Sequence, residues 1–495
     1  MIGNIFLYLP NNFIGLFLLL VIFVLTFLLI FKLNKSEWII YTLLVWFPLE
    51  SLILMYTPIE FFAYVKYIPE IIMYGLAFGS LISYIKDKRK ILPKQPLNKW
   101  LIAFVVVALI SLLLNFYSWT TWLLGLRQIL RFVLLVFVIL WMDYDEKILK
   151  KIIKFGATMI ALEIILGFVQ YLSGGYLDPY LFSSRTVSIG NLALLGGLEE
   201  FWTQGSRVFA TLGRYDQLGS FVALGIILMF PFVFFLKKRQ DKFWYFIFFI
   251  LAFVVLYLTK SRASWIATFL GVVTIGWFLR KDKRVALGIG VFLTIFVAYL
   301  GFFALSHDNV LSIGDKPTQT LGERVFEAFS IQGLRDSYDG YGRIFFIINT
   351  PRMVVTKYPF FGVGPGQYGG GVAAALLNTD MYDRLHLPFG IQNIFGQIDN
   401  NWMSIWGEVG TIGLIVWIMV FVTIIKMSLL VRNKTENIFE KNLAEGLIGL
   451  TVGIMAIGFF GPYFEFRSLM FYYWATVGVV MVFFVRRYNK NYLEN

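Results

Sequence analysis

The side chains best suited to chemistry in this sequence are an aspartate and an asparagine that stand just before a long apolar run. Asp399 and Asn400 occur in "QIDNNWMSIWGEVGTIG", where Gly410 and Gly413 complete the spacing D-N-x9-G-x-x-G. A carboxylate at the start of a helix can accept the proton of a sugar hydroxyl when cations nearby hold the other reactant. Asp399 is equally suited to cap that helix, so both interpretations stay open.

Several cationic side chains lie at the ends of other apolar runs. Arg127 and Arg131 are four residues apart in "LGLRQILRF", so they share one face of a helix. Arg207 and Arg214 precede an apolar run in "SRVFATLGRYDQLGSFVALG", in which Asp216 is more suited to capping the helix than to catalysis. The remaining cations of this kind are Lys260 and Arg262 in "LTKSRASWIATFLG" and Arg343 in "YGRIFFIINTPRM".

Arginine and lysine at such positions favour an anionic ligand. The guanidinium group binds phosphate in bidentate fashion, and a helix N-terminus with arginine beside it is a ready anion site. Each cation also has an alternative role: Arg127 as a side chain that snorkels, and Lys260 with Arg262 as an interfacial anchor. Gly362, Gly364 and Gly366 let the backbone approach a ligand closely, and they are equally common in turns.

The elements that must position these residues are membrane helices. Of 495 residues, 58% are hydrophobic and 15% are charged, a composition that suits lipid rather than water. We predict one all-α, polytopic integral membrane domain over residues 1–495, with about 12–13 transmembrane helices. The predicted spans cover residues 13–31, 38–56, 69–85, 98–115, 123–141, 153–172, 217–236, 243–259, 264–279, 285–305, 402–425, 443–464 and 468–485.

The connectors between these spans sort by charge. The lysine-rich connectors fall on one side, which the positive-inside rule assigns to the cytoplasm, with the N-terminus outside and the C-terminus inside. Pro48 and Glu50 interrupt the second span; if that span is re-entrant, the count becomes twelve and the N-terminus moves inside. With either count, the chain has one large extracytoplasmic loop, residues 306–401, which is too long for a simple connector.

The two sides differ in the kind of cation they carry. The predicted cytoplasmic side has 20 Lys and 7 Arg, whereas the outer side has 4 Lys and 12 Arg. Insertion treats the two residues alike, so the excess of arginine outside indicates a phosphate-bearing ligand. The alternative is that these arginines cap helices and pair with outward acids. Most of the net charge of +13 comes from cations that set the orientation of the protein in the membrane, so we expect no nucleic-acid partner.

Residue types that are scarce narrow the possible chemistry. The sequence has no cysteine and only His307 and His386, so thiol catalysis and a histidine or thiolate metal centre are not expected. We expect no metal and no cofactor. The basic start of a secretory signal peptide is missing before the apolar run at Phe13, which we expect to be a retained helix.

Taken in order, these elements resemble the superfamily of O-antigen ligases and Wzy-type O-antigen polymerases. The resemblance covers a core at about residues 200–430, with "RVFATLGRYDQLG", "SRASW", Gly342 with Arg343, "YPFFGVGPGQY", and the helix that carries Glu408 and Gly410. It implies a GT-C-like, metal-independent, inverting glycosyltransferase. Such an enzyme joins glycans carried on undecaprenyl diphosphate at the outer face of the bacterial cytoplasmic membrane, with its active site facing the periplasm or exterior.

One departure from the family pattern favours a polymerase. Ligases of this superfamily carry a histidine, to which the role of base is assigned, where this sequence has Asp399. The resemblance therefore implies Asp399 as candidate base, with Asn400, Arg262 and Arg343 as the other catalytic candidates. His386 is the alternative base. The predicted ligands of the diphosphate are Arg127, Arg207, Arg214, Lys260, Arg262 and Arg343.

The leading hypothesis is polymerisation of undecaprenyl-diphosphate-linked repeat units into O-antigen, capsular or exopolysaccharide. The expected partners are the lipid-linked glycan donor and acceptor, the lipid bilayer and a chain-length regulator. One alternative is an O-antigen ligase or O-oligosaccharyltransferase that moves the glycan to another acceptor. Alternatives of other classes are a flippase or transporter for lipid-linked oligosaccharide and a structural subunit of a glycan assembly complex.

Overall fold

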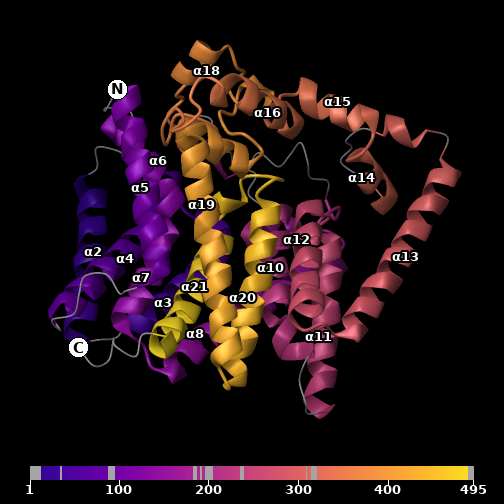
Figure 1. The fold of residues 1–495 in the computed structure, drawn as a ribbon, viewed down its shortest axis with the longest axis horizontal. Helices are drawn as coiled ribbons and strands as arrows, with labels where there is room; N and C mark the ends of the chain where they lie inside the picture. The colour runs from indigo at the N-terminus through magenta and orange to yellow at the C-terminus, as the bar shows by residue number, and fades with distance from the viewer. Residues whose placement is uncertain are drawn as a thin grey trace.

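The structure is a computed structural model, and helices make up most of it (Figure 1). It describes residues 13–33, 36–86, 95–181, 187–189, 192–195, 204–234, 239–307, 309–313 and 320–488. Two short strands, β1 (Val187–Ile189) and β2 (Leu192–Leu195), pair antiparallel.

A helix lies over each of the thirteen predicted spans. These helices are α2 (Phe13–Leu33), α3 (Ser36–Met55), α4 (Ile59–Lys86), α5 (Pro96–Asn115), α6 (Trp119–Leu130) continued by η1 (Arg131–Val133) and α7 (Leu134–Met142), α8 (Glu146–Leu172), α10 (Tyr215–Phe234), α11 (Arg239–Leu258), α12 (Arg262–Val273) continued by η3 (Thr274–Leu279), α13 (Lys283–Ser306), α19 (Asn401–Lys434), α20 (Ile438–Ile457) and α21 (Arg467–Tyr488). Within the described residues, ten spans are long and apolar enough to cross a membrane, and α2 and α11 contribute shorter apolar stretches. The chain is therefore an all-α polytopic membrane protein, as predicted.

The second predicted span is a continuous helix, α3, despite the residues that interrupt its apolar pattern. Pro48 lies inside the helix, and the helix is one of the ten long apolar spans. Glu50 is buried, and its carboxylate pairs with Arg467 of α21 and with Lys66 of α4. A buried carboxylate with two cationic partners is tolerated in a helix that packs against other helices.

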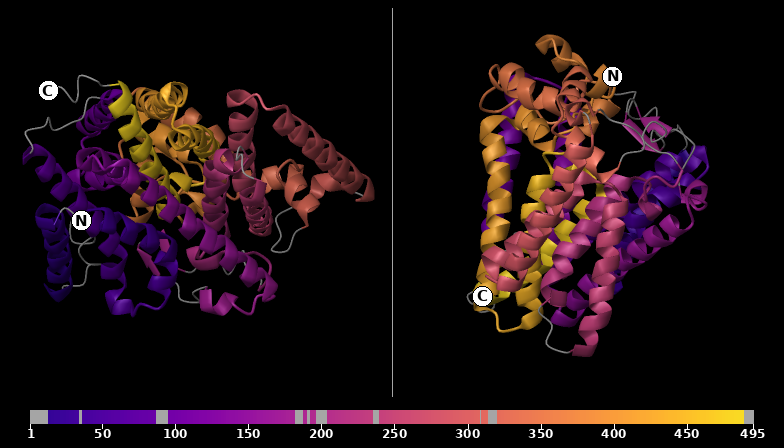
Figure 2. Two further views of the ribbon diagram at one scale, coloured as in Figure 1. Left: turned by 90° about the horizontal axis from the view of Figure 1, so that it is seen from below. Right: turned by 90° about the vertical axis from the view of Figure 1, so that its right-hand side faces the viewer.

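The helices pack around α21, which is buried along its whole apolar length. Helix α10 is the next most buried span, whereas only 6% of α13 is buried. Figure 1 shows α13 leaning away from α12, and the left panel of Figure 2 shows it at the edge of the bundle. An apolar helix buried on all sides belongs in a core, and an apolar helix exposed on all sides belongs in lipid.

One end of the bundle carries the long predicted loop, and we call it the loop end: residues 309–313 and 320–400 cover it (Figure 1). Strands β1 and β2 lie near the same end (Figure 2). The short helices of this loop are η4 (Val310–Ser312), α14 (Leu321–Glu327), α15 (Ile331–Asp339), α16 (Arg343–Asn349), η5 (Thr350–Val355), α17 (Gly371–Ala375), α18 (Asp380–Leu385) and η6 (Ile391–Asn393). Elsewhere the chain has α9 (Asp178–Leu181), η2 (Ala210–Leu212) and η7 (Tyr463–Glu465).

The opposite end of the bundle is tied together by ion pairs. Glu445 is fully buried, and its carboxylate oxygens accept from Arg280 Nε at 2.5 Å and from Arg432 Nε at 2.8 Å. Arg487 and Glu440 form another pair at this end, with their atoms 2.7 Å apart. The connectors after η3, α19 and α21 therefore meet on one side, in agreement with the predicted sorting of the charges.

Helix α19 is broken at Gly410, and this break explains the first glycine of the D-N-x9-G-x-x-G spacing. Gly410 has φ 67° and ψ −172°, a backbone conformation almost exclusive to glycine. Residues 359–364 lie in the break: Val363 N–H donates to Gly407 O at 2.9 Å, and Thr411 N–H donates to Pro359 O at 2.9 Å. The loop and the helix thus share one hydrogen-bond network.

Candidate functional site

Arg343 and Asp399 form the centre of the candidate site. Arg343 is the first residue of α16, and its Nη2 donates to Asp399 Oδ2 at 2.5 Å and to the carbonyl oxygen of Phe460 at 2.6 Å. Both side chains are about a third exposed, at 31%. The predicted base, Asp399, and a predicted phosphate ligand, Arg343, therefore meet at the loop end, although 56 residues separate them in the sequence.

Asp399 does not cap α19, because Asn400 does. The side chain of Asn400 accepts the Met403 N–H at 3.1 Å, and its Nδ2 donates to Phe459 O at 3.2 Å. Asn400 is completely buried. Asn400 thus has a structural role in this geometry, and the Asp399 carboxylate is left to face the arginines.

A second arginine–aspartate pair lies beside the first. Arg214 donates in bidentate fashion to Asp216, from Nη2 to Oδ2 at 2.9 Å and from Nε to Oδ1 at 3.0 Å. Asp216 lies in the first turn of α10, where its Oδ1 also accepts the Gln217 N–H at 3.0 Å. Tyr463 has a buried ring, its hydroxyl is hydrogen-bonded to Ser261, and it lies within electrostatic range of both aspartates.

Arg207 and Lys260 extend the cationic cluster. Arg207 is 4% exposed, its guanidinium lies 4.3 Å from the centre of the Tyr215 ring, and among the described residues its Nε and Nη1 have no hydrogen-bond partner. Lys260 stands in the tight turn between α11 and α12. Burial lowers the pKa of Lys260 first, and the positive charges of Arg207 and Arg324 lower it further. These cations are therefore close enough to repel one another, and an anionic ligand would relieve that repulsion.

Arg262, the first residue of α12, is bound by the long loop. Its Nη1 donates to Glu327 Oε2 at 3.1 Å and to Arg324 O at 2.7 Å, and its Nη2 donates to Glu327 Oε1 at 3.2 Å. Arg324 also pairs with Glu327, with Nη1 and Oε2 3.0 Å apart. Helix α14 is thereby fastened over the end of α12.

The cluster of charges formed by these residues has more cations than carboxylates. The cations are Arg207, Arg214, Lys260, Arg262, Arg324 and Arg343, and the carboxylates are Asp216, Glu327 and Asp399. Burial raises the pKa of Asp399; Arg343 and Arg214 oppose this shift, and Asp216 adds to it. A carboxylate with a raised pKa is a stronger base than a solvated one, and the surrounding cations suit an anionic ligand.

Arg127 lies in a different cluster. Its guanidinium donates to Glu70 Oε2 and to the Tyr74 hydroxyl, the latter at 3.2 Å. Arg131 Nη1 lies 3.1 Å from Glu70 Oε1, and Arg467 Nη2 lies 3.4 Å from the same oxygen. The structure therefore places Arg127 with Glu70 of α4 rather than with Asp399.

This cluster predicts a large stability effect for Glu70→Gln. The substitution leaves three partly buried guanidinium groups without the buried carboxylate that they share, and breaking a buried ion pair costs on the order of 3–5 kcal/mol. We expect a clear fall in the melting temperature of the purified protein in detergent. Glu60→Gln, at an exposed position on the same helix, is the matched control. Equal melting of the two variants would show that the cluster does not stabilise the fold.

Two contributors to the site were missed by the sequence analysis. Glu327, which binds Arg262, occurs in a polar part of the loop without any motif. Tyr463 was placed inside the predicted span 443–464, but α20 ends at Ile457, so that span boundary was wrong. Gly458, Gly461 and Pro462 follow the end of the helix, and this run of helix-breaking residues could have signalled it.

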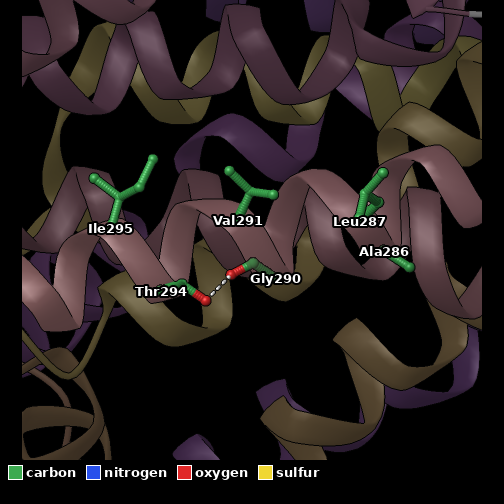
Figure 3. A pocket seen from close by; sticks show the side chains of 6 residues that line it. All are labelled: Ala286, Leu287, Gly290, Val291, Thr294 and Ile295. Carbon is green, nitrogen blue, oxygen red and sulfur yellow. Dashed lines mark hydrogen bonds between the residues drawn. The ribbon is translucent and has the colours of Figure 1, made fainter.

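The alternative base His386 and a hollow on α13 both lie away from the charged cluster. His386 is exposed at the end of α18, with φ 52°, and within the described part of the chain its side chain makes no hydrogen bond or ion pair with the charged cluster. Figure 3 shows a shallow hollow on α13, where the Thr294 hydroxyl donates to Gly290 O at 2.9 Å. It is lined by Ala286, Leu287, Gly290, Val291, Thr294 and Ile295. None of these side chains is ionisable, so the hollow offers no group for acid–base chemistry.

Comparison with known proteins connects this geometry to a family. The family model Wzy_C, described as O-antigen ligase, matches residues 247–418. The match contains Lys260, Arg262, Arg343, Asp399 and Asn400, and it confirms the predicted resemblance to the O-antigen ligase and Wzy-type superfamily. No curated protein matches the chain. The family supports a ligase- or polymerase-type function in O-antigen synthesis, and thus an enzyme that acts on lipid-linked glycans.

Proposed function

We propose that this protein is a glycosyltransferase that polymerises undecaprenyl-diphosphate-linked repeat units into O-antigen, capsular or exopolysaccharide. The observation that carries the proposal is the Arg343–Asp399 pair inside a cluster of cations. A polymerase needs a base for the acceptor hydroxyl and cations for the diphosphate of the donor. The cluster supplies both types of group at one end of a membrane bundle.

The cations are proposed to hold the diphosphate and to stabilise it as it leaves. Arg207 has two buried nitrogens without a partner among the described residues, so a phosphate oxygen would satisfy donors that the protein leaves open. Lys260 lies close to Arg207, and Arg214 and Arg262 belong to the same cluster of charges. Since arginine and phosphate form bidentate contacts, a diphosphate can bridge several of these side chains.

Asp399 is proposed to act as the base once the donor has bound. In the structure its carboxylate neutralises Arg343, with Nη2 and Oδ2 2.5 Å apart. A diphosphate near Arg343 competes for the same guanidinium and leaves the carboxylate free to accept a proton. The acceptor hydroxyl then attacks the anomeric carbon, the bond to the diphosphate breaks, and the proton stays on Asp399. The reaction inverts the anomeric configuration and uses no metal in this proposal.

An aspartate at this position favours the polymerase over the ligase. The resembled ligases have a histidine there, whereas Asp399 with Asn400 is more similar to the polymerase branch. The alternative acceptor, as in a ligase or O-oligosaccharyltransferase, would use the same cluster. We propose further that the loop end faces the periplasm or exterior, because the lysine-rich connectors meet at the opposite end.

The decisive experiment supplies the purified protein in liposomes with a lipid-linked repeat unit that carries a fluorescent label. A polymerase gives a ladder of products, each longer by one repeat, when the products are separated by gel electrophoresis. A single product that appears only with a separate acceptor would identify a ligase instead. Movement of label across the bilayer without a new glycosidic bond would identify a transporter, and would contradict the proposal.

A further inference from the structure

Two glutamates outside the charged cluster, on separate elements, accept hydrogen bonds from the glycine-rich loop, residues 362–371. Glu408 of α19 is 4% exposed, and its Oε1 accepts the Gly366 N–H at 2.9 Å. Glu465 of η7 accepts the Gly371 N–H at 3.4 Å. Backbone hydrogen bonds to two separate elements therefore fix the course of the loop.

The two carboxyl groups face a common small cavity. An added Cβ at Gly370 would lie 3.5 Å from Glu408 Oε1 and 3.8 Å from Glu465 Oε1, so both oxygens point towards this glycine. The cavity has a volume of about 30 Å³ and is lined by Gly125, Gln128, Ile129, Gly370, Asn401, Ser404, Ile405, Glu408, Trp417, Phe464, Glu465 and Met470. That volume holds one water molecule, which can bridge a carboxyl group to a buried donor.

The groups around the pair leave its negative charge largely uncompensated. Among the described residues, neither Glu408 nor Glu465 has a cationic side chain within 4.0 Å of its carboxylate oxygens. Arg131 is the nearest cation to Glu465, but its Nη1 pairs with Glu70 and its Nη2 donates to the backbone oxygen of Glu465 at 3.0 Å. The other ionisable groups within electrostatic range of Glu408 are the hydroxyls of Tyr117 and Tyr382, whereas Tyr368 contacts Glu408 through its backbone N–H.

A buried carboxylate, Glu408, and a partly buried one, Glu465, cannot both ionise at low cost in such surroundings. Each loses its hydration, and each repels the other. Burial raises the pKa of Glu465 to about 7, and Arg131 opposes this shift. At neutral pH the pair can therefore retain a proton and form hydrogen bonds that two carboxylates would not form.

The pair is also connected to the proposed base. Gln397, two residues before Asp399, donates its Nε2 to Glu465 Oε2 at 3.1 Å. Ile398 N–H donates to the carbonyl oxygen of Gly369, within the glycine-rich loop, at 3.0 Å. The position of the segment that carries Asp399 thus depends on Glu465 directly and on the loop indirectly.

We propose that Glu408 and Glu465 form a proton-sharing carboxyl pair that positions the glycine-rich loop and, through it, Asp399. They are positioning residues, since neither contacts the reacting atoms. The link to turnover rests on the proposed function, but the proton-sharing itself does not. Loss of the shared proton should loosen the loop whether or not substrate is present.

The first test is the melting temperature of the purified protein as a function of pH. The folded-state pKa of Glu465, about 7, lies above its ordinary value of 4.5. Between pH 4.5 and about 7, the folded state therefore holds a proton that the unfolded state has released. Its contribution to stability is present below pH 4.5 and is lost as the pH rises to about 7. We expect Glu465→Gln, which keeps a neutral side chain at every pH, to remove this part of the decline.

A matched set of variants separates proton-sharing from simple packing. Glu465→Ala removes the hydrogen bonds to Gly371 and Gln397, so it should lower the melting temperature at every pH. If Glu465→Gln folds poorly, Glu408→Gln serves as the second test, because it replaces the other member of the pair with a neutral side chain. Both glutamine variants declining with pH as steeply as the wild type would overturn the proposal.

The second test is the pH profile of chain elongation. The wild type should lose activity as the pH rises above about 7, and Glu465→Gln should keep its activity there, because its neutral amide is not deprotonated. An identical alkaline decline in both proteins would contradict the positioning role. If the wild type makes no product, the proposed function fails, and the melting experiment still decides whether the pair shares a proton.

Discussion

Asp399→Asn is expected to reduce the rate of glycosidic bond formation by about 100-fold or more, since a general base contributes roughly 10²–10⁴-fold. The asparagine has the same shape and can still accept a hydrogen bond from Arg343, but it cannot take the proton of the acceptor. The measurement is the initial rate of ladder formation in liposomes at saturating lipid-linked substrate. In the wild type the rate should rise with pH as Asp399 ionises, and burial moves this rise above the ordinary pH range of an aspartate.

Asp383→Asn is the matched control for this variant. Asp383 is exposed on α18, in the same loop but outside the charged cluster, so its replacement should leave the rate unchanged. Both proteins should show wild-type amounts in the membrane. A rate for Asp399→Asn within a factor of a few of the wild type would rule out Asp399 as the base, and the exposed His386 would be the next residue to test.

Arg343→Lys is expected to lower the turnover number by about 10²–10³-fold, the range for loss of one group that stabilises charge in a transition state. The guanidinium group contacts Asp399 Oδ2 and Phe460 O through Nη2 and approaches Asp399 O through Nε. Lysine keeps the charge but has no planar fork, so it cannot form these contacts and bind a phosphate in bidentate fashion as well. Single-turnover kinetics should therefore show a slow chemical step rather than only weaker binding.

Arg335→Lys is the corresponding control. Arg335 is exposed on α15, a short distance along the chain from Arg343, and the same exchange there should have no effect. A normal turnover number for Arg343→Lys, with only the Michaelis constant raised, would mean that Arg343 acts as a simple point charge for binding.

Hydropathy alone was sufficient to predict the helices of the bundle. An apolar run of the right length has few alternatives to a helix in lipid, which is why a helix lies over every predicted span. The ends of the helices were harder to predict. Helix α4 begins at Ile59 and contains Glu70 in the middle, where the predicted span began at residue 69, because three arginines from other helices neutralise that glutamate.

The candidate site was only partly predictable, for a similar reason. Residue type and spacing indicated Arg207, Arg214, Arg262 and Arg343 as potential anion ligands, and Asp399 as a potential base. Which cations share a cluster depends on the tertiary packing of helices that are far apart in the sequence. Arg127 and Arg262 were both predicted as ligands of the diphosphate, yet Arg127 is bound by Glu70 and Arg262 by Glu327 of the long loop.

The break in α19 limits how this protein can vary. The backbone from Pro359 to Gly364 is hydrogen-bonded to both halves of the helix, on either side of Gly410. One residue inserted into or deleted from that stretch would move every one of these bonds out of register, although the stretch lies in a loop. We therefore expect loop exchange between homologues to succeed only when the crossover points keep residues 359–364 together with 407–412, and insertions to be tolerated instead in the exposed turn near Asp339.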